Sequence, residues 1–358
     1  MKQVQNKQLD FNGQDIFVGL DVHKKNWSVC ILTKDMEHKV MTIDSKPEIL
    51  IGYLRKNFPN ANYHSAYEAG YCGFGWHDDL KNGGIDSMVV NPGDVPTTNK
   101  EKTNKTDPID RRKLARSLRN GELSSIYIPD SIAREARSLV RTRYQFVKDQ
   151  SRTMNRIKSI VSFYGIEIPL ELENSHWSRK FIEWLKNYKL KTNYGTKCLQ
   201  YHIERLISIR SDVAKVTQQI RIMGREPRYK ENIDLLMSIP GIGILTAMVF
   251  MTEIIDINRF KGLNELASFI GISPGEHSSG DIKHTKGITK RGNRYLRSLL
   301  VEAAWMAVRH DPSLMMAYTE YKKKINHSKS IIKITRKLLN RIRFVLKNHK
   351  KYEKGVVQ

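Results

Sequence analysis

Short apolar runs alternate with polar turns over the first part of the chain, and this pattern predicts strands. Residues 16–33, IFVGLDVHKKNWSVCILT, predict two strands around a short polar turn, and residues 62–70 and 84–95 predict two more. Between them, residues 47–58, PEILIGYLRKNF, carry apolar residues at helical spacing. Strands that alternate with helices indicate an α/β layer.

From about residue 131 the pattern becomes that of long amphipathic helices. The stretch 131–165 has no glycine or proline before its last residue, and its apolar residues form a helical stripe: Ile132, Ala136, Leu139, Val140, Val147, Met154, Ile157 and Val161. A second helix is expected over 198–223, where Leu206, Val213 and Ile220 recur at seven-residue spacing. Two such helices predict an antiparallel hairpin or a coiled coil, with the stripe used for packing or dimerisation.

The remaining C-terminal part combines helices with two glycine-containing segments. SIPGIG, residues 238–243, predicts a tight turn that opens a helix, as in a helix-hairpin-helix element. The backbone N–H groups at Gly241 and Gly243 would then face a phosphate, although any short helix connection can use proline and glycine. Residues 277–294, HSSGDIKHTKGITKRGNR, predict a polar, basic loop between helices, and 329–351 predict a final basic amphipathic helix.

Charge indicates the class of partner. The chain of 358 residues has 61 Lys and Arg against 37 Asp and Glu, a net charge of +24. Such a charge attracts polyanions, of which nucleic acid is the commonest, and a soluble basic surface is the plainer alternative. The three cysteines are scattered without a CxxC pair, so neither a disulfide framework nor a zinc site is indicated. No apolar run approaches the length of a membrane span, and a cytoplasmic protein is expected.

Four acidic residues lie where predicted strands end or a predicted helix begins. Asp21 lies inside the apolar run VGLDVH, where an unpaired carboxylate is costly, and Glu68 ends a strand. Asp107 and Asp110 open a helix in KTDPIDRRKLARSL, where they could serve as caps. Taken alone, this pair favours capping, but it could also hold a metal ion, because carboxylate oxygens are the ligands of Mg²⁺ and two ions can stabilise both oxygens of a phosphodiester exchange. A capped helix would fix both side chains on one side of its first turn, so the two interpretations are compatible.

These motifs together resemble the insertion-sequence transposases of the DEDD type, relatives of the Piv DNA invertases that include bridge-RNA-guided recombinases. The resemblance spans nearly the whole chain. GLDVHK, YEAG, VVNP and KTDPIDRRKLA carry it in the N-terminal part, and SIPGIG, ASFIGISPGEHSSG and ITKRGNRYLRSLL carry it in the C-terminal part.

The resemblance implies an α/β plus all-α fold. A RuvC-like, ribonuclease-H-like DEDD catalytic domain would span residues 1–130, and a long helical hairpin or coiled coil 131–230. A helical transposase domain with the catalytic serine and the helix-hairpin-helix-like element would span 231–320, followed by the basic C-terminal helix over 321–358.

It also implies Mg²⁺-dependent cleavage and exchange of DNA strands. The four acids, Asp21, Glu68, Asp107 and Asp110, would be catalytic ligands of two Mg²⁺ ions, and Ser279, next to Ser278, would be the nucleophile. The basic residues that follow it would neutralise phosphates or form a solvated cationic face: Lys283, Lys286, Lys290, Arg291, Arg294 and Arg297. The implied partners are donor and target DNA, a guide RNA from the same element, and further copies of the chain in a homodimer or homotetramer near a prokaryotic nucleoid.

Two alternatives compete with this interpretation. A RuvC-like nuclease or junction resolvase would need the four acids but not Ser279. A non-catalytic nucleic-acid-binding protein would need the acids only as caps.

Overall fold

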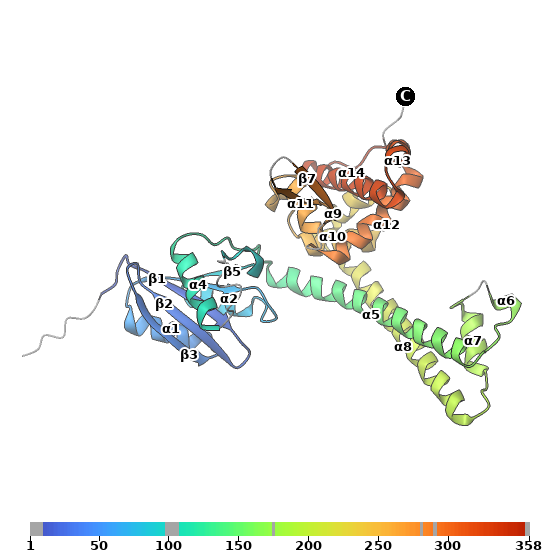
Figure 1. Cartoon of the computed structure of the whole chain (residues 1–358), viewed down its shortest axis with the longest axis horizontal. Helices are drawn as coiled ribbons and strands as arrows, with labels where there is room; N and C mark the ends of the chain where they lie inside the picture. The colour runs from blue at the N-terminus through green and yellow to red at the C-terminus, as the bar shows by residue number, and fades with distance from the viewer. Residues whose placement is uncertain (1–9, 97–106, 174–175, 280–281, 289–291, 355–358) are drawn as a thin grey trace, which may run out of the picture. The chain divides into compact units, whose positions relative to one another are not determined.

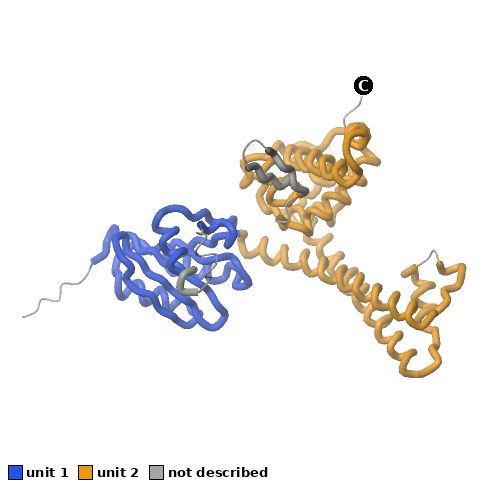
Figure 2. The backbone as a smooth tube through the Cα atoms, in the orientation of Figure 1, with its two compact units in different colours: residues 1–128 blue, residues 129–358 orange. Residues whose placement is uncertain are grey.

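The computed structural model describes residues 10–96, 107–173, 176–279, 282–288 and 292–354, with side chains except at 107–110 and 274–287. The chain forms two compact units, which meet between Ile128 and Pro129 (Figure 2). The first is α/β and the second is almost wholly helical, as the pattern of the sequence predicts. The finer domain boundaries stay predictions.

The first unit is built on a five-stranded sheet with the order β3-β2-β1-β4-β5 (Figure 1). Strands β1 and β4 and strands β4 and β5 pair in parallel, whereas β2 pairs antiparallel with both β1 and β3. This mixed order is consistent with a ribonuclease-H-like domain. The strands are β1 (Asp15–Val22), β2 (Asn26–Leu32), β3 (Glu37–Asp44), β4 (Asn62–Glu68) and β5 (Ile85–Val90).

Alternation along β1 assigns its side chains to two faces of the sheet. Its even-numbered residues from Ile16 to Val22 pack in one core with Leu50 and Leu54 of α1 (Pro47–Asn57) and Leu80 of α2 (Gly75–Asn82). The odd-numbered residues face α4 (Asp107–Arg119), which packs against β1 and β2 on the opposite side. Asp21 therefore belongs to the α4 face. The sequence patterns used above gave no prediction for β3 or α2.

The second unit begins with a helical hairpin of α5 (Ser131–Phe163) and α8 (Asn193–Met223), as predicted (Figure 1). Its far end has a core of its own, where α7 (Arg179–Asn187) packs on both helices, and the short α6 (Leu170–Glu173) lies between α5 and α7. Its root joins the main core through Ala136, Val140, Ile220 and Met223. Most of the predicted stripe is buried or half-buried, but Ile132 is 57% exposed.

The main core of the second unit is formed by the helices after the hairpin. The central ones, α10 and α14, bury most of their apolar residues, and α14 does so with the predicted stripe from Ile331 to Val345. No helix in the described parts of the chain is long and apolar enough to cross a lipid bilayer. The helices are α9 (Pro227–Met237), α10 (Ile244–Ile254), α11 (Leu263–Ile270), α12 (Arg294–His310), α13 (Pro312–Lys324) and α14 (His327–Asn348).

The segment predicted as a basic loop contains regular structure. Strands β6 (Pro274–Ser279) and β7 (Ile282–Ile288) pair antiparallel between α11 and α12. The prediction of a loop was therefore wrong for this part. Two residues, Gly280 and Asp281, separate the strands in the sequence, and such a spacing with glycine is a hairpin signal that outweighs the polar composition.

Candidate functional site

Asp21 lies one residue before the end of β1, on the face of the sheet that α4 covers. Its side chain is 25% exposed, and its Oδ2 lies 3.2 Å from His23 Nε2. His23 follows two residues later, where strand periodicity returns a side chain to the same face. Sequence reasoning missed His23, although GLDVH contains the period-two spacing that could have identified it.

Glu68 ends β4, the neighbouring parallel strand. The register pairs Gly19 with Ala66 and Leu20 with Tyr67, so its next step places Asp21 beside Glu68. Aligned residues of parallel strands point to the same face, and both side chains are half-buried. The structure thus brings together two of the four predicted acids at the carboxyl end of adjacent strands.

Helix α4 approaches the same face so closely that the sheet needs a glycine beneath it. A Cβ added to Gly19 would lie 2.9 Å from Ala115 Cβ, and closer still to the carbonyl oxygen of Arg111 and the amide nitrogen of Ala115. The guanidinium of Arg111 donates to Ser28 Oγ, and Ser28 pairs with Asp21 across β1 and β2. The beginning of α4 therefore lies toward the end of the sheet that holds Asp21.

The other two predicted acids belong to the first turn of that helix. Asp107 is its first residue and Asp110 lies one turn further, but the side chains of both are outside the described residues. Among the described side chains, no three His, Cys, Asp or Glu residues form a metal-binding group. The donor set nevertheless suits a hard divalent cation, because Asp21 and Glu68 offer carboxylate oxygens at one edge of the sheet.

Further from this edge, the face of the sheet that α4 covers carries an ion pair and a buried thiol. Arg112 of α4 donates to both carboxylate oxygens of Glu37 at 3.0 Å, and this lowers the pKa of Glu37. Cys30, which pairs with Gly19 and lies two residues along β2 from the partner of Asp21, is buried under α4. Its burial, followed by the nearby charge of Glu37, raises the pKa of its thiol to about 11. Cys30 is therefore a packing residue and not a nucleophile at neutral pH.

In the second unit, the SIPGIG turn joins α9 to α10. Gly241 has a φ of +88°, and a Cβ there would lie 2.9 Å from the amide nitrogen of Ala307 on α12 and closer to the carbonyl oxygen of Ala303. Close packing on α12 thus accounts for this glycine. Gly243 precedes the first residue of α10, is exposed and has open space around it. Of the two predicted phosphate contacts, Gly243 has the geometry of a helix N-terminus open to an anion.

The predicted nucleophile and most of its basic neighbours lie outside the described side chains. Ser279 and Ser278 are in β6 and Lys283 and Lys286 in β7, known here by their backbone alone, and Lys290 and Arg291 are outside the described residues altogether. Two predicted contacts are described. Arg294 is exposed at the beginning of α12, and half-buried Arg297 donates to the carbonyl oxygen of Gly271 at 3.0 Å.

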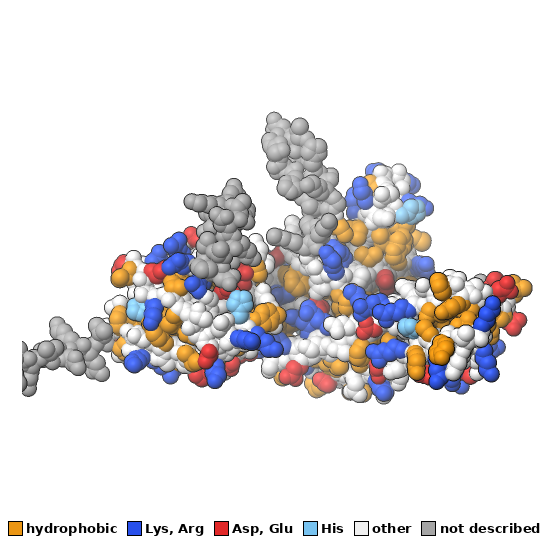
Figure 3. Space-filling view, turned by 60° about the horizontal axis from the view of Figure 1, so that its bottom comes forward, with side chains coloured by type: hydrophobic (Ala, Val, Ile, Leu, Met, Phe, Trp, Pro, Cys, Tyr) orange, Lys and Arg blue, Asp and Glu red, His pale blue; other side chains and the backbone are white. Residues whose placement is uncertain are grey.

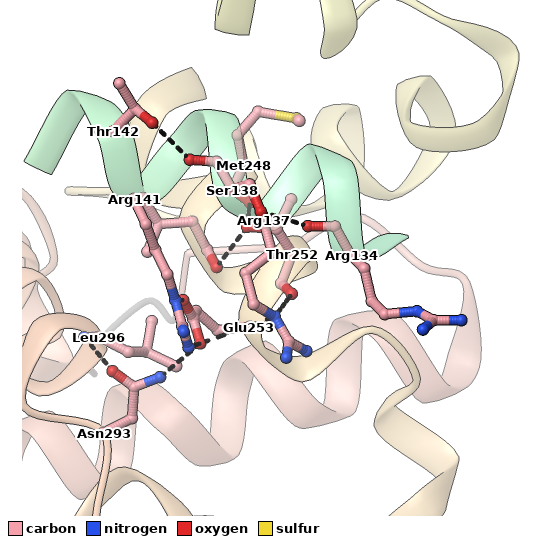
Figure 4. Close-up of polar contacts among 11 residues, drawn as sticks. Arg134, Arg137, Ser138, Arg141, Thr142, Met248, Thr252, Glu253, Asn293 and Leu296 are labelled. Carbon is pink, nitrogen blue, oxygen red and sulfur yellow. Dashed lines mark hydrogen bonds and ion pairs between the residues drawn. The ribbon is translucent and has the colours of Figure 1, made fainter. Parts of the chain in front are cut away.

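Sequence reasoning missed a buried carboxylate in the second unit. Glu253, at the end of α10, is 2% exposed. It accepts hydrogen bonds from Arg141 Nε and Nη2, each at 2.8 Å, and from Asn293 Nδ2 at 2.7 Å (Figure 4). Arg137 lies 4.0 Å away and also donates to the carbonyl oxygen of Thr252. The sequence signal was a lone acid in the apolar run AMVFMTEI.

Asn293 connects this cluster with the beginning of α12. Its side-chain oxygen accepts the Leu296 amide N–H at 3.0 Å and so caps α12, while its amide group donates to Glu253. One residue therefore connects the beginning of α12 with α10 and, through Arg141, with α5.

Comparisons with known proteins identify relatives of both units. A family profile described as "Transposase" (DEDD_Tnp_IS110) matches residues 18–166, which include Asp21, Glu68, Asp107 and Asp110. A second, described as "Transposase IS116/IS110/IS902 family", matches residues 233–320, which include Glu253 and the hairpin strands.

Three individual relatives match over long stretches. A candidate transposase of Sinorhizobium fredii, y4qE, is 27% identical over 303 residues, 82% of this chain and 72% of the relative. The transposase for insertion sequence element IS1533 of Leptospira borgpetersenii is 25% identical and covers 81% of this chain and 84% of its own length. The transposase for IS1111A of Coxiella burnetii is 25% identical over 66% of this chain and 63% of its own.

Proposed function

Because the chain belongs to the IS116/IS110/IS902 transposase family and is therefore a DNA transposase, we propose a chemistry for its strand exchange. In this proposal a group of four carboxylates binds Mg²⁺ against the DNA phosphate, and a serine of the C-terminal unit carries the cleaved strand. An RNA from the same element selects the DNA.

One observation carries the metal site. Asp21 and Glu68 lie side by side at the carboxyl ends of two adjacent parallel strands, on the face of the sheet that α4 covers. Because α4 begins with Asp107 and runs over Gly19, its first turn starts toward the same edge of the sheet. The arrangement supports four acids in one group.

Asp21, Glu68, Asp107 and Asp110 would hold the divalent ions. Bound there, Mg²⁺ would supply Lewis-acid stabilisation of the attacking and leaving oxygens of a phosphodiester, with two ions as the expected number. The protein's own contribution is to fix the carboxylates. Parallel pairing fixes Asp21 relative to Glu68, and the close approach at Gly19 fixes α4 against the sheet.

Ser279 is proposed as the nucleophile. Its Oγ would attack the phosphorus and form a phosphoserine ester while the phosphodiester bond breaks; the serine proton would pass to the departing sugar oxygen. The reverse attack by a sugar hydroxyl of another strand would release the serine. The ester conserves the energy of the phosphodiester, so strand exchange needs no ATP. The basic segment 283–297 would neutralise the phosphates at the break.

The guide RNA is proposed from the family resemblance alone, whereas the assembly follows from the demands of the reaction. A net charge of +24 supports binding of more than one nucleic acid strand, and recombination between two DNA duplexes must hold four strand ends. We therefore propose a homodimer or homotetramer with donor DNA, target DNA and a guide RNA.

The test compares Asp21→Asn and Ser279→Ala in an assay of strand cleavage and exchange with Mg²⁺. Asp21→Asn should reduce cleavage about a hundredfold or more, because metal binding supplies several kcal/mol of charge stabilisation, while DNA binding persists. Asp44→Asn, at the exposed end of β3, is the matched control and should leave both unchanged.

Ser279→Ala should abolish the covalent protein–DNA adduct that denaturing gels detect with the wild-type chain, and Ser278→Ala should not. Strand exchange at the wild-type rate by Ser279→Ala would show that the serine is not the nucleophile and would favour a nuclease that uses the carboxylates alone.

A further inference from the structure

A hollow on the surface of the second unit is lined by seven residues, of which four are cations. It measures about 390 Å³ and lies against α14, with Leu263 of α11 and Tyr321 of α13 on its sides. From α14 come Lys333, Arg336, Lys337, Asn340 and Arg341. No Asp or Glu is among its lining residues, and α14 itself carries seven Lys or Arg and no acidic residue between His327 and Asn348.

One of these cations is part of the structure and forms a fixed wall. Arg341 donates to Asp311 Oδ2 at 2.6 Å, and its guanidinium lies 5.0 Å from the centre of the Tyr352 ring. Asp311 is fully buried and also accepts the Tyr352 hydroxyl at 2.6 Å and the Leu314 amide N–H at 3.0 Å. The hydrogen bonds of the Asp311 carboxylate are therefore all made beneath the surface, and this carboxylate does not neutralise the remaining cations of the hollow.

The other three cations are available to a ligand. Lys333 lies 4.9 Å from the centre of the Tyr321 ring, and Arg336 donates to the side-chain oxygen of Asn264. Neither these two nor Lys337 forms an ion pair with any residue that the structure describes. Three positive charges in a hollow repel one another unless an anion lies between them, so the arrangement favours bound phosphate over a solvated face.

The spacing of the cations matches a strand of nucleic acid. Lys333 and Lys337 are four residues apart, about 6 Å along the helix axis, which is close to the separation of successive phosphates on one strand. Asn340 extends the same row and can donate to a further phosphate or sugar oxygen. The ring of Tyr321 is half-buried and covered by Lys333, so it offers no face for a base to stack on.

We propose that this hollow, the α14 groove, binds the sugar-phosphate backbone of DNA without reading its bases. The inference rests on the proposed function only in taking DNA as the partner. Figure 3 shows Lys and Arg side chains grouped on the visible faces of both units, and the α14 groove differs from such groups because it is concave and free of acids. Contacts of this kind set the position of a protein on DNA and add affinity that does not depend on sequence.

The experiment is equilibrium binding of the full chain to a labelled DNA duplex of arbitrary sequence, over a series of salt concentrations and with EDTA present. The variant Lys333→Ala/Lys337→Ala is compared with Lys329→Ala/Lys347→Ala, which removes the same charge from exposed positions of α14 outside the groove. Each lost phosphate contact should reduce the slope of log K against log salt by about 0.9, hence by about 1.8 for the groove variant, with about tenfold or greater loss of affinity at low salt.

The control should keep the wild-type slope, and thermal unfolding should be the same for both variants because all four lysines are exposed. Equal slopes for the two variants would overturn the inference. A second titration uses a single-stranded RNA of the same length, and a loss confined to RNA would also overturn the assignment to DNA. The binding measurement needs no cleavage. A negative result for the α14 groove therefore does not affect the Asp21→Asn test of the metal site, and a negative result of that test does not affect the groove.

Discussion

Replacing Glu253 by glutamine is expected to loosen the second unit at the root of its helical hairpin. Glutamine keeps the shape of the side chain but offers one oxygen where Glu253 offers two. Both oxygens of Glu253 accept hydrogen bonds, one from Arg141 Nε and the other from Arg141 Nη2 and Asn293 Nδ2. Whichever way the new amide turns, its NH₂ group faces a donor, so at least one of the three hydrogen bonds is lost.

The magnitude follows from how buried each partner is. Breaking a fully buried ion pair costs about 3–5 kcal/mol, and a hydrogen bond to a charged group contributes about 1.5–3 kcal/mol. Glu253 is 2% exposed, but the side chain of Arg141 is 52% exposed, so water can solvate the arginine once the carboxylate is gone. We therefore expect Glu253→Gln to lower the free energy of unfolding by about 2–3 kcal/mol.

Urea unfolding followed by far-ultraviolet circular dichroism measures this change, because most helices belong to the second unit. Glu302→Gln is the matched control: it makes the same chemical change at an exposed position of α12 and should alter stability by less than about 0.5 kcal/mol. In a double-mutant cycle, Arg141→Gln should lower the free energy of unfolding much less in the Glu253→Gln background than in the wild type. Unfolding of Glu253→Gln at the wild-type urea concentration would refute the reasoning.

Three further predictions concern other parts of the chain. Gly19→Ala should push α4 off the sheet, destabilising the first unit by about 1–3 kcal/mol and reducing Mg²⁺-dependent cleavage; wild-type values of both in unfolding and cleavage assays would contradict this. A maleimide at pH 8 should label exposed Cys198 within minutes and buried Cys30 only after unfolding, as mass spectrometry can show. Asp130 caps α5, and the Ala133 amide N–H, followed by Arg228, holds the pKa of this carboxyl below its usual 3.8. Its contribution is present above pH 3.8 and lost as the pH falls through the lower folded-state pKa, so Asp130→Ala should cost about 1 kcal/mol at pH 7 and much less near pH 2 in thermal unfolding.

The elements that position the carboxylates could be predicted because their signals are local. The strand that contains Asp21 begins with a continuous apolar run, the strand that Glu68 ends is bounded by a glycine, and Pro108 marks the first turn of α4. What the sequence could not supply is the register of the sheet. Residues that pair between β1 and β4 are 47 positions apart in the sequence, as Asp15 and Asn62 are, and strands this far apart can pair in many registers. Only the fold shows that Asp21 lies beside Glu68.

The same limit explains what was missed in the second unit. A glycine in SIPGIG is equally compatible with a phosphate contact and with close packing, and the choice for Gly241 depends on α12, more than sixty residues away. Polar composition also concealed β6 and β7, because their sequences contain no apolar alternation to reveal them. The α14 groove was visible only as a basic amphipathic helix, since its concave form depends on α11 and α13.

The Glu253 cluster has a consequence for how the second unit can move. Arg141 belongs to the hairpin, Glu253 to the main core and Asn293 to the beginning of α12, and all three meet on one buried carboxylate. The variant Asn293→Asp separates the link from the cap, because aspartate still caps α12 but cannot donate to Glu253 and adds a second negative charge beside it. If the hydrogen bond between Asn293 and Glu253 holds α12 in place, Asn293→Asp should slow strand exchange more than its loss of stability explains. An osmolyte that restores the stability of this variant should then not restore its rate of strand exchange. A shift of the hairpin root must change the partners of Glu253, and Asn293 carries that change into the basic segment 283–297, which is proposed to neutralise the cleaved phosphate.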